Sequence, residues 1–148
     1  MAILGGGPGG GGPIGSGNAF TGTSEGINLV GDFAYATTTQ STSTSLQTMI
    51  EYTSGNYLFV GELYLSAGNH LVTAEAGSSS SFRVQFNGQN VALARCESDL
   101  ESGERGTPAQ TVIPLIIPPY TEVKVIVDSD VTDGDKYTSL FLAGRIYH

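Results

Sequence analysis

The sequence is poor in cations, and this scarcity limits its partners. Lys and Arg together number 6 of 148 residues, against 14 Asp and Glu, so the formal net charge is -8. Nucleic acid is bound by cationic surfaces that release its counterions, and anionic membranes attract basic segments. No run approaches the roughly 18 apolar residues of a membrane-spanning helix. We therefore expect neither nucleic acid nor a membrane as partner.

Cysteine and histidine are nearly absent as well. Cys96 is the single cysteine, which excludes an internal disulfide and any zinc site built on several cysteines. We expect Cys96 to be a small buried hydrophobic side chain. The two histidines, His70 and His148, are not accompanied by a Gly-x-Ser-x-Gly elbow, and no phosphate-binding glycine motif follows a predicted strand. The sequence thus predicts no enzymatic activity, no metal and no cofactor.

Two acidic segments are the remaining candidates for chemistry. Residues 128–135 hold Asp128, Asp130, Asp133 and Asp135, a density that is compatible with Ca²⁺ binding. Their spacing is not that of an EF-hand, and Asp and Gly also form ordinary turns, so we expect a turn, with a cation site as the alternative. Residues 97–110 carry several more acids. Hydrolysis by two carboxylates needs them fixed across a cleft, and a solvated loop is expected here instead.

The N-terminal region is dominated by glycine. Residues 5–17 contain nine glycines and two prolines. Such a segment buries too little apolar area to offset the entropy of ordering it, so a flexible arm is predicted. The first residues also lack the basic start and apolar stretch of a secretion signal, and we expect synthesis in a cytoplasm. We divide the chain into an arm, residues 1–20, and a folded domain, residues 21–148. The arm's apolar anchors are expected to contact a neighbouring molecule: Ile3, Leu4, Ile14 and Phe20.

The rest of the chain has the two-residue period of β-strands, with no amphipathic helix. Strands are expected at residues 33–40, 46–52, 57–65, 71–76, 82–86, 89–96, 111–117, 121–128 and 137–147. Asn87-Gly88 is a strong hairpin signal because both residues tolerate positive φ. We also expect a turn at residues 67–69 and a polar loop at residues 77–81. Short strands separated by frequent turns predict an all-β, antiparallel jelly-roll sandwich of about eight strands.

Two of these strands, residues 57–65 and 137–147, carry apolar side chains on both faces. One face of an antiparallel sandwich ordinarily meets water, so a second apolar face needs a cover. A second subunit is the simplest cover, and single exposed aromatics are the alternative. We expect a homotrimer, with an interface formed by Tyr57, Phe59, Leu63, Tyr137, Phe141, Leu142 and Tyr147.

Short motifs resemble two known groups. Residues 55–59, Gly-Asn-Tyr-Leu-Phe, and residues 142–147, Leu-Ala-Gly-Arg-Ile-Tyr, are similar to strands of the trimeric jelly-roll heads of tumour necrosis factor and complement proteins. Residues 115–125, Leu-Ile-Ile-Pro-Pro-Tyr-Thr-Glu-Val-Lys-Val, resemble the small decoration, or cement, proteins of tailed bacteriophage capsids. The glycine-rich start and residues 18–22 share that likeness.

The resemblance implies a non-enzymatic, trimeric virion protein. Its partner would be the major capsid protein, its place the outer surface of the capsid, and its site of synthesis the host cytoplasm. Arms of such proteins reach over the shell. A receptor-binding head on a phage fibre is the main alternative, and a small carbohydrate-binding domain, Ca²⁺-dependent or hydrolytic, is a further one.

Overall fold

The computed structural model describes residues 27–69, 77–98 and 109–147, which form nine β-strands and no helix. None of these described segments therefore provides a helix that could cross a membrane. The strands are β1 (Asn28–Val30), β2 (Phe33–Thr42), β3 (Gln47–Thr53), β4 (Leu58–Asn69), β5 (Ser78–Phe86), β6 (Gln89–Ser98), β7 (Ala109–Ile117), β8 (Glu122–Ser129) and β9 (Asp133–Tyr147). The predicted arm, with Ile3, Leu4, Ile14 and Phe20, lies outside the described residues.

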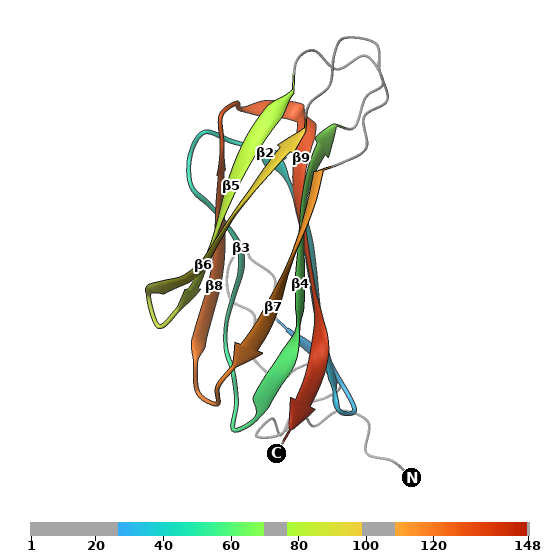
Figure 1. The fold of residues 1–148 in the computed structure, drawn as a ribbon, viewed down its shortest axis with the longest axis vertical. Helices are drawn as coiled ribbons and strands as arrows, with labels where there is room; N and C mark the ends of the chain where they lie inside the picture. Colours follow the sequence, from blue (N-terminus) through green and yellow to red (C-terminus); the bar gives the residue numbers. More distant parts are fainter. Residues whose placement is uncertain (1–26, 70–76, 99–108, 148) are drawn as a thin grey trace.

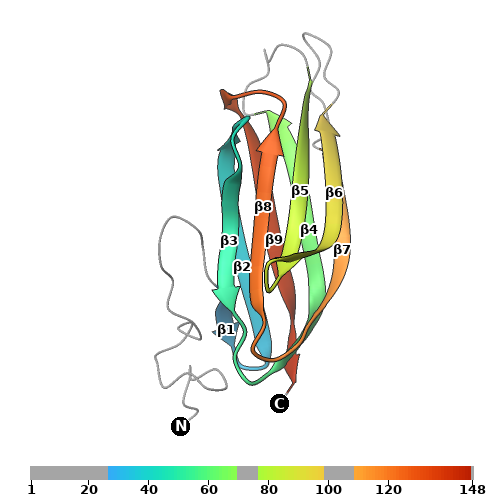
Figure 2. The ribbon, with the colours of Figure 1, turned by 90° about the vertical axis from the view of Figure 1, so that its left-hand side faces the viewer.

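The strands form two antiparallel sheets that lie face to face (Figures 1 and 2). One sheet has the order β1-β2-β9-β4-β7 and the other has the order β3-β8-β5-β6. The pairings β2–β9, β3–β8, β4–β7 and β5–β6 are those of one long hairpin folded over on itself. The β4–β9 and β5–β8 pairings then join the folded hairpin into sheets. This connectivity is a jelly roll of eight strands with β1 added at an edge, and it confirms the predicted fold class.

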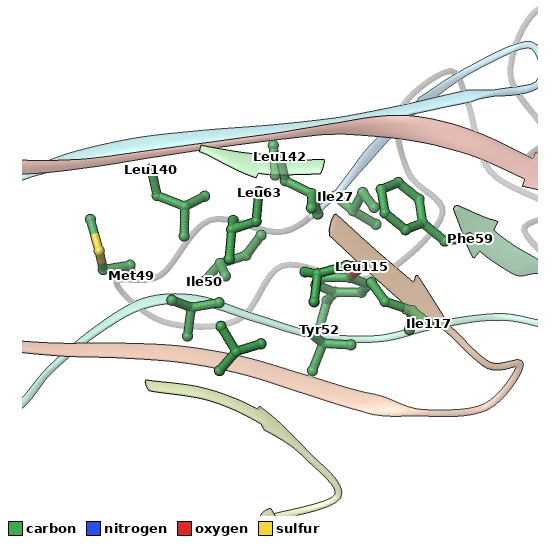
Figure 3. Close-up of a cluster of buried hydrophobic side chains, with 14 of the residues drawn as sticks. Ile27, Met49, Ile50, Tyr52, Phe59, Leu63, Leu115, Ile117, Leu140 and Leu142 are labelled. Carbon is green, nitrogen blue, oxygen red and sulfur yellow. The ribbon is translucent and has the colours of Figure 1, made fainter. Parts of the chain in front are cut away.

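The core fills the space between the two sheets. Alternate side chains of β8, Val123, Val125 and Val127, are each 1% exposed, which confirms the two-residue period read from the sequence. Figure 3 shows Leu63 and Leu140 of one sheet pointing toward the layer formed by β3. Cys96 is also buried in this core, as predicted, and its thiol lies 3.7 Å from the carbonyl oxygen of Leu65. Burial raises the pKa of that thiol.

Local turn chemistry agrees with the sequence at two places. Asn87 and Gly88 connect β5 to β6 with φ values of 49° and 76°, as expected of a two-residue hairpin. The Asn87 side chain also accepts a hydrogen bond from the amide of Glu122 at 2.9 Å, which fixes the hairpin to β8. Pro118 and Pro119 follow Ile117, the last residue of β7, which is where the strand expected from residue 111 was to end.

Two predicted loops are wrong. The expected turn at residues 67–69 is part of β4, because Ala67 and Gly68 pair with Thr138 and Tyr137 of β9. The expected polar loop at residues 77–81 is the start of β5 from Ser78 onward. Ser80 tolerates full burial there because its hydroxyl bonds the hydroxyl of Ser129 at 2.8 Å inside the sandwich.

Two glycines allow an aromatic ring to lie flat against the centre of the larger sheet. Gly61 of β4 pairs with Gly144 of β9, and the ring of Phe59 covers both. A Cβ atom on Gly144 would lie 2.5 Å from the ring carbon Cζ of Phe59 and 2.5 Å from the carbonyl oxygen of Val60. A Cβ atom on Gly61 would meet the same ring carbon at 2.6 Å and the carbonyl oxygen of Ala143. Neither position has room for a side chain.

We predict that Gly144→Ala destabilises the protein by about 1–3 kcal/mol, because the ring and the backbone must both shift to admit the methyl group. Gly134→Ala is the matched control, since nothing lies within 4 Å of its Cβ position. It is expected to change stability by less than about 0.5 kcal/mol. Urea unfolding measures both values, and equal stability of the two variants would contradict the prediction.

Candidate functional site

The outward side of the five-stranded sheet is strongly apolar. Seven of its large apolar side chains are between 38% exposed, at Val60, and 63% exposed, at Ile116, and Tyr64 is half-buried among them. We call this surface the apolar face and define it by Phe33, Tyr35, Val60, Tyr64, Val112, Ile116, Phe141 and Tyr147. Monomeric proteins rarely expose a contiguous apolar surface of several hundred Å², and such surfaces are typical of interaction sites.

The strand register makes this surface continuous. It places the outward side chains of β2, β9, β4 and β7 in three adjacent rows: Phe33–Arg145–Val60–Ile116, Tyr35–Ala143–Glu62–Pro114 and Thr37–Phe141–Tyr64–Val112. A fourth row, next along the sheet, is entirely polar: Thr39–Ser139–Ser66–Gln110. The hydroxyls of Ser66 and Ser139 lie 2.6 Å apart and bond to each other. The polar row bounds the apolar face on that side.

Aromatic contacts organise the apolar face. The rings of Tyr64 and Phe141 lie 5.9 Å apart between centroids, at an interplanar angle of 41°. The guanidinium of Arg145 lies 5.9 Å from the ring centroid of Phe33 and 5.5 Å from that of Tyr147, which is cation–π distance. Four of the five rings of the face, those of Phe33, Tyr64, Phe141 and Tyr147, are therefore held by a neighbour, which preorganises this part of the face for contact.

The face also contains a carboxylate. Glu62 accepts a short hydrogen bond from the hydroxyl of Tyr64. This hydrogen bond, followed by the negative charge of Glu62 itself, raises the pKa of the Tyr64 phenol. Tyr64 therefore remains a neutral donor at physiological pH.

The outward side of the four-stranded sheet is different in character. Three ion pairs cross it, Arg83–Asp128 at 2.9 Å, Arg95–Glu97 at 2.9 Å and Lys124–Glu51 at 3.2 Å. A shallow groove of about 380 Å³ lies beside Leu93, between Arg83 and Arg95. Because both guanidinium groups already have acidic partners, the groove offers no uncompensated charge to a ligand.

Seven residues were predicted at a subunit interface, and the structure separates them by side-chain direction. Tyr57, Phe59, Leu63 and Leu142 are at most 2% exposed and pack the protomer's own core, so they do not reach a partner surface. Phe141 and Tyr147 are 43% and 46% exposed on the apolar face. The side chain of Tyr137 also lies on the outward side of β9, where it is half-buried against Gly68.

The error has a physical cause. Adjacent residues of a strand point to opposite sides, so an apolar run on both faces gives no indication of which residues point inward. The missed signal was the polar residues that alternate with the apolar ones on the same side of each strand. Glu62 and Arg145 mark the side of β4 and β9 that is not in the core. That signal identifies Val60 and Tyr64 as outward, and pairing with β2 and β7 then adds Phe33, Tyr35, Val112 and Ile116.

Three of the four carboxylates in the acidic segment at residues 128–135 have hydrogen-bond or ion-pair partners. Asp128 pairs with Arg83, Asp130 accepts the amide of Ser79 at 3.0 Å, and Asp133 accepts the amide of Asp135 at 2.9 Å. Among the described residues, no three His, Cys, Asp or Glu side chains gather as metal ligands do. Asp128 and Asp130 thus fix the end of β8 to β5, and Asp133 bonds locally at the start of β9. The segment at residues 99–108 lies outside the described residues.

No family model matches the chain, and no curated protein matches it in sequence. Among solved structures, the chain is similar to the tumour necrosis factor Eiger of S. frugiperda at 10% identity and a TM-score of 0.36, over 75% of this chain and 85% of that one. It is also similar to a chain of infectious bursal disease virus, Gt strain, at 14% identity and a TM-score of 0.39, over 88% of this chain and 38% of that one.

A subviral particle of the VP2 protein of the same virus matches at 14% identity and a TM-score of 0.36, over 82% of this chain and 35% of that one. The chain therefore spans little more than a third of these viral chains. A tumour necrosis factor and a viral capsid protein are thus among the solved structures it is similar to. At such TM-scores these likenesses carry no argument about function, and the jelly-roll assignment rests on the strand order. The finer resemblance to phage decoration proteins stays a prediction.

A pair of neighbouring residues tests the assignment of inward and outward sides. We predict that Leu142→Asp unfolds the protomer, because it places a carboxylate at a position 2% exposed and removes a core side chain. Phe141→Asp, at a position 43% exposed, is expected to leave the sandwich folded. Circular dichroism and thermal unfolding distinguish them, and a folded Leu142→Asp variant or an unfolded Phe141→Asp variant would refute the assignment.

Proposed function

We propose that the protein is a non-enzymatic structural component of a virion, a homotrimer that decorates and stabilises the outer surface of a bacteriophage capsid. The observation that carries the proposal is the apolar face, which one protomer leaves uncovered beside an opposite sheet that is crossed by ion pairs. The trimeric state and the capsid as partner follow the resemblance of residues 115–125 and of the terminal strand to the proteins named above.

The energetics favour covering the apolar face with protein. Full burial of a large apolar side chain contributes about 1.5–3 kcal/mol, and each side chain here has only its exposed part still to bury. Association itself costs on the order of 4–15 kcal/mol, so several of the eight side chains must be buried together. When copies of the chain are related by a rotation that closes into a ring, the apolar face of every copy is buried and no copy is left with an open contact.

A carbohydrate ligand fits this face less well. Sugars stack on free aromatic rings, and here Arg145 already occupies the rings of Phe33 and Tyr147. Much of the remaining surface is aliphatic, at Val112 and Ile116 among others. Branched aliphatic side chains contribute through close packing, which another protein surface supplies.

The capsid contact in this proposal belongs to the glycine-rich arm. Ile3, Leu4, Ile14 and Phe20 supply apolar anchors, and the glycines between them allow the backbone to pass close to a neighbour. Three arms on one trimer would add avidity to the contact made by the jelly roll. The ion-paired sheet is then free to face solvent.

The trimer is tested by its mass. Light scattering at micromolar concentration is expected to give three times the chain mass of 15.4 kDa. Phe141→Asp is expected to lower that mass to one chain, because it places a charge in the contact while the protomer stays folded. A wild-type mass of one chain would contradict the association.

The arm is tested by deletion. We predict that removal of residues 2–17 leaves the trimer intact and weakens its binding to purified capsids, because the apolar anchors and their avidity are lost. Cosedimentation with capsids measures the loss, with the full-length trimer as control. Equal binding of both proteins would refute a role for the arm. Electron microscopy that placed a few copies at fibre tips, rather than many across the shell, would favour a receptor-binding head.

A further inference from the structure

The apolar face carries one acid and one base at its centre. Glu62 lies on β4 and Arg145 on β9, the two middle strands of the face. Val60 is the register partner of Arg145, so Glu62 and Arg145 lie two residues apart along neighbouring strands. Among the described cations, Arg83, Arg95 and Lys124 are in ion pairs of the other sheet and Lys136 is buried. Arg145 is thus the one exposed cation of the apolar face within the described part of the chain.

Within its own protomer, Arg145 is directed away from Glu62. Its guanidinium lies over the rings of Phe33 and Tyr147, and it approaches Asp32 in the β1–β2 turn at 3.6 Å. The side chain remains 54% exposed. Since a guanidinium carries five N–H donors in a planar fork, Asp32 leaves donors available on the outward side.

The carboxylate of Glu62, by contrast, has few partners within its own protomer. Its only hydrogen-bond partner in the described structure is the hydroxyl of Tyr64, and it forms no ion pair with a described residue. Its register partners on either side are Ala143 and Pro114, which supply no side-chain donor. Covering this carboxylate with an apolar surface would remove its water without compensation, which is strongly unfavourable. Any protein that covers the face must therefore bring a donor to Glu62.

A second copy of this chain brings that donor. We propose that Glu62 of one protomer forms an ion pair with Arg145 of the next protomer, so that a closed ring of copies contains one such pair at every contact. The inference rests on the proposed function, because it requires the apolar face to meet a second copy. Each copy then contributes Arg145 to the contact on one side and Glu62 to the contact on the other. A closed ring therefore leaves neither charge unpaired. Carboxylate and guanidinium match in geometry, since both are planar and can form two parallel hydrogen bonds.

The pair also explains why charge is retained on an otherwise apolar face. Apolar contacts are tolerant of sliding, whereas an ion pair surrounded by apolar groups is satisfied in one alignment only. Other apolar surfaces that lack the matching charge are rejected, because they would desolvate Glu62 and Arg145 without pairing them. Glu62 and Arg145 would thus determine which surface the face accepts and in what register.

The test is a charge exchange at two exposed positions. Glu62→Arg and Arg145→Glu are each expected to raise the dissociation constant of the wild-type assembly at least about tenfold, because each places like charges across the contact. The double variant, Glu62→Arg with Arg145→Glu, restores opposite charges and is expected to recover most of the association. Sedimentation velocity over a concentration series measures the constant, and circular dichroism checks that each variant is folded.

The matched controls lie on the other sheet, where Glu51→Arg and Lys124→Glu alter an exposed ion pair without touching the apolar face. These are expected to leave association unchanged. If the wild-type protein assembles and the single variants at Glu62 and Arg145 assemble equally well, the ion pair is refuted while the subunit association stands. If both single variants dissociate and the double variant does not recover, the direct pairing is refuted. A wild-type protein that is monomeric at all concentrations overturns the association on which the inference rests.

Discussion

The pairing of β4 with β9 is the contact on which both surfaces of the larger sheet depend. It runs the length of β4 and requires glycine at Gly61 and Gly144, where the ring of Phe59 lies against the two strands. The same register that brings these glycines together on the inner side brings Glu62, Tyr64, Phe141 and the hydroxyls of Ser66 and Ser139 together on the outer side. Core packing and the composition of the exposed face are therefore set by one alignment.

The architecture was largely predictable from the sequence, because it follows from local features. The two-residue period of β8 and the Asn87-Gly88 hairpin each depend on neighbouring residues only. The burial of Ser78 and Ser80 did not follow, since the hydroxyl of Ser80 bonds that of Ser129, which lies on β8, a strand distant in the chain. The prediction of the interface residues was partly wrong for a related reason. Phe59 and Val60 are both apolar, and only the long-range register, or the polar parity of Glu62 and Arg145, shows which one points outward.

The two outer surfaces show how a protein with few charges distributes them. Three ion pairs lie on the four-stranded sheet, where water screens them and each contributes little stability. Leu93 and Val91 are also exposed on that surface, but only at its β6 edge. On the opposite sheet, charge is reduced to Glu62 and Arg145 with nearby Asp32, and exposed area is given to rings and branched chains. The asymmetry gives the sandwich one surface suited to protein contact and one suited to solvent.

The order of the strands has a consequence for how the chain matures. β9 follows every other described strand in the chain, yet it lies inside the larger sheet, between β2 and β4. During synthesis β2 has no neighbour on that side until residues 133–147 have left the ribosome. Pairings between strands so far apart in the sequence form slowly. Until β9 pairs with them, the exposed edges of β2 and β4 are prone to aggregation. The apolar face is assembled by that same last strand, so a nascent chain cannot recognise its neighbours before its own fold is complete.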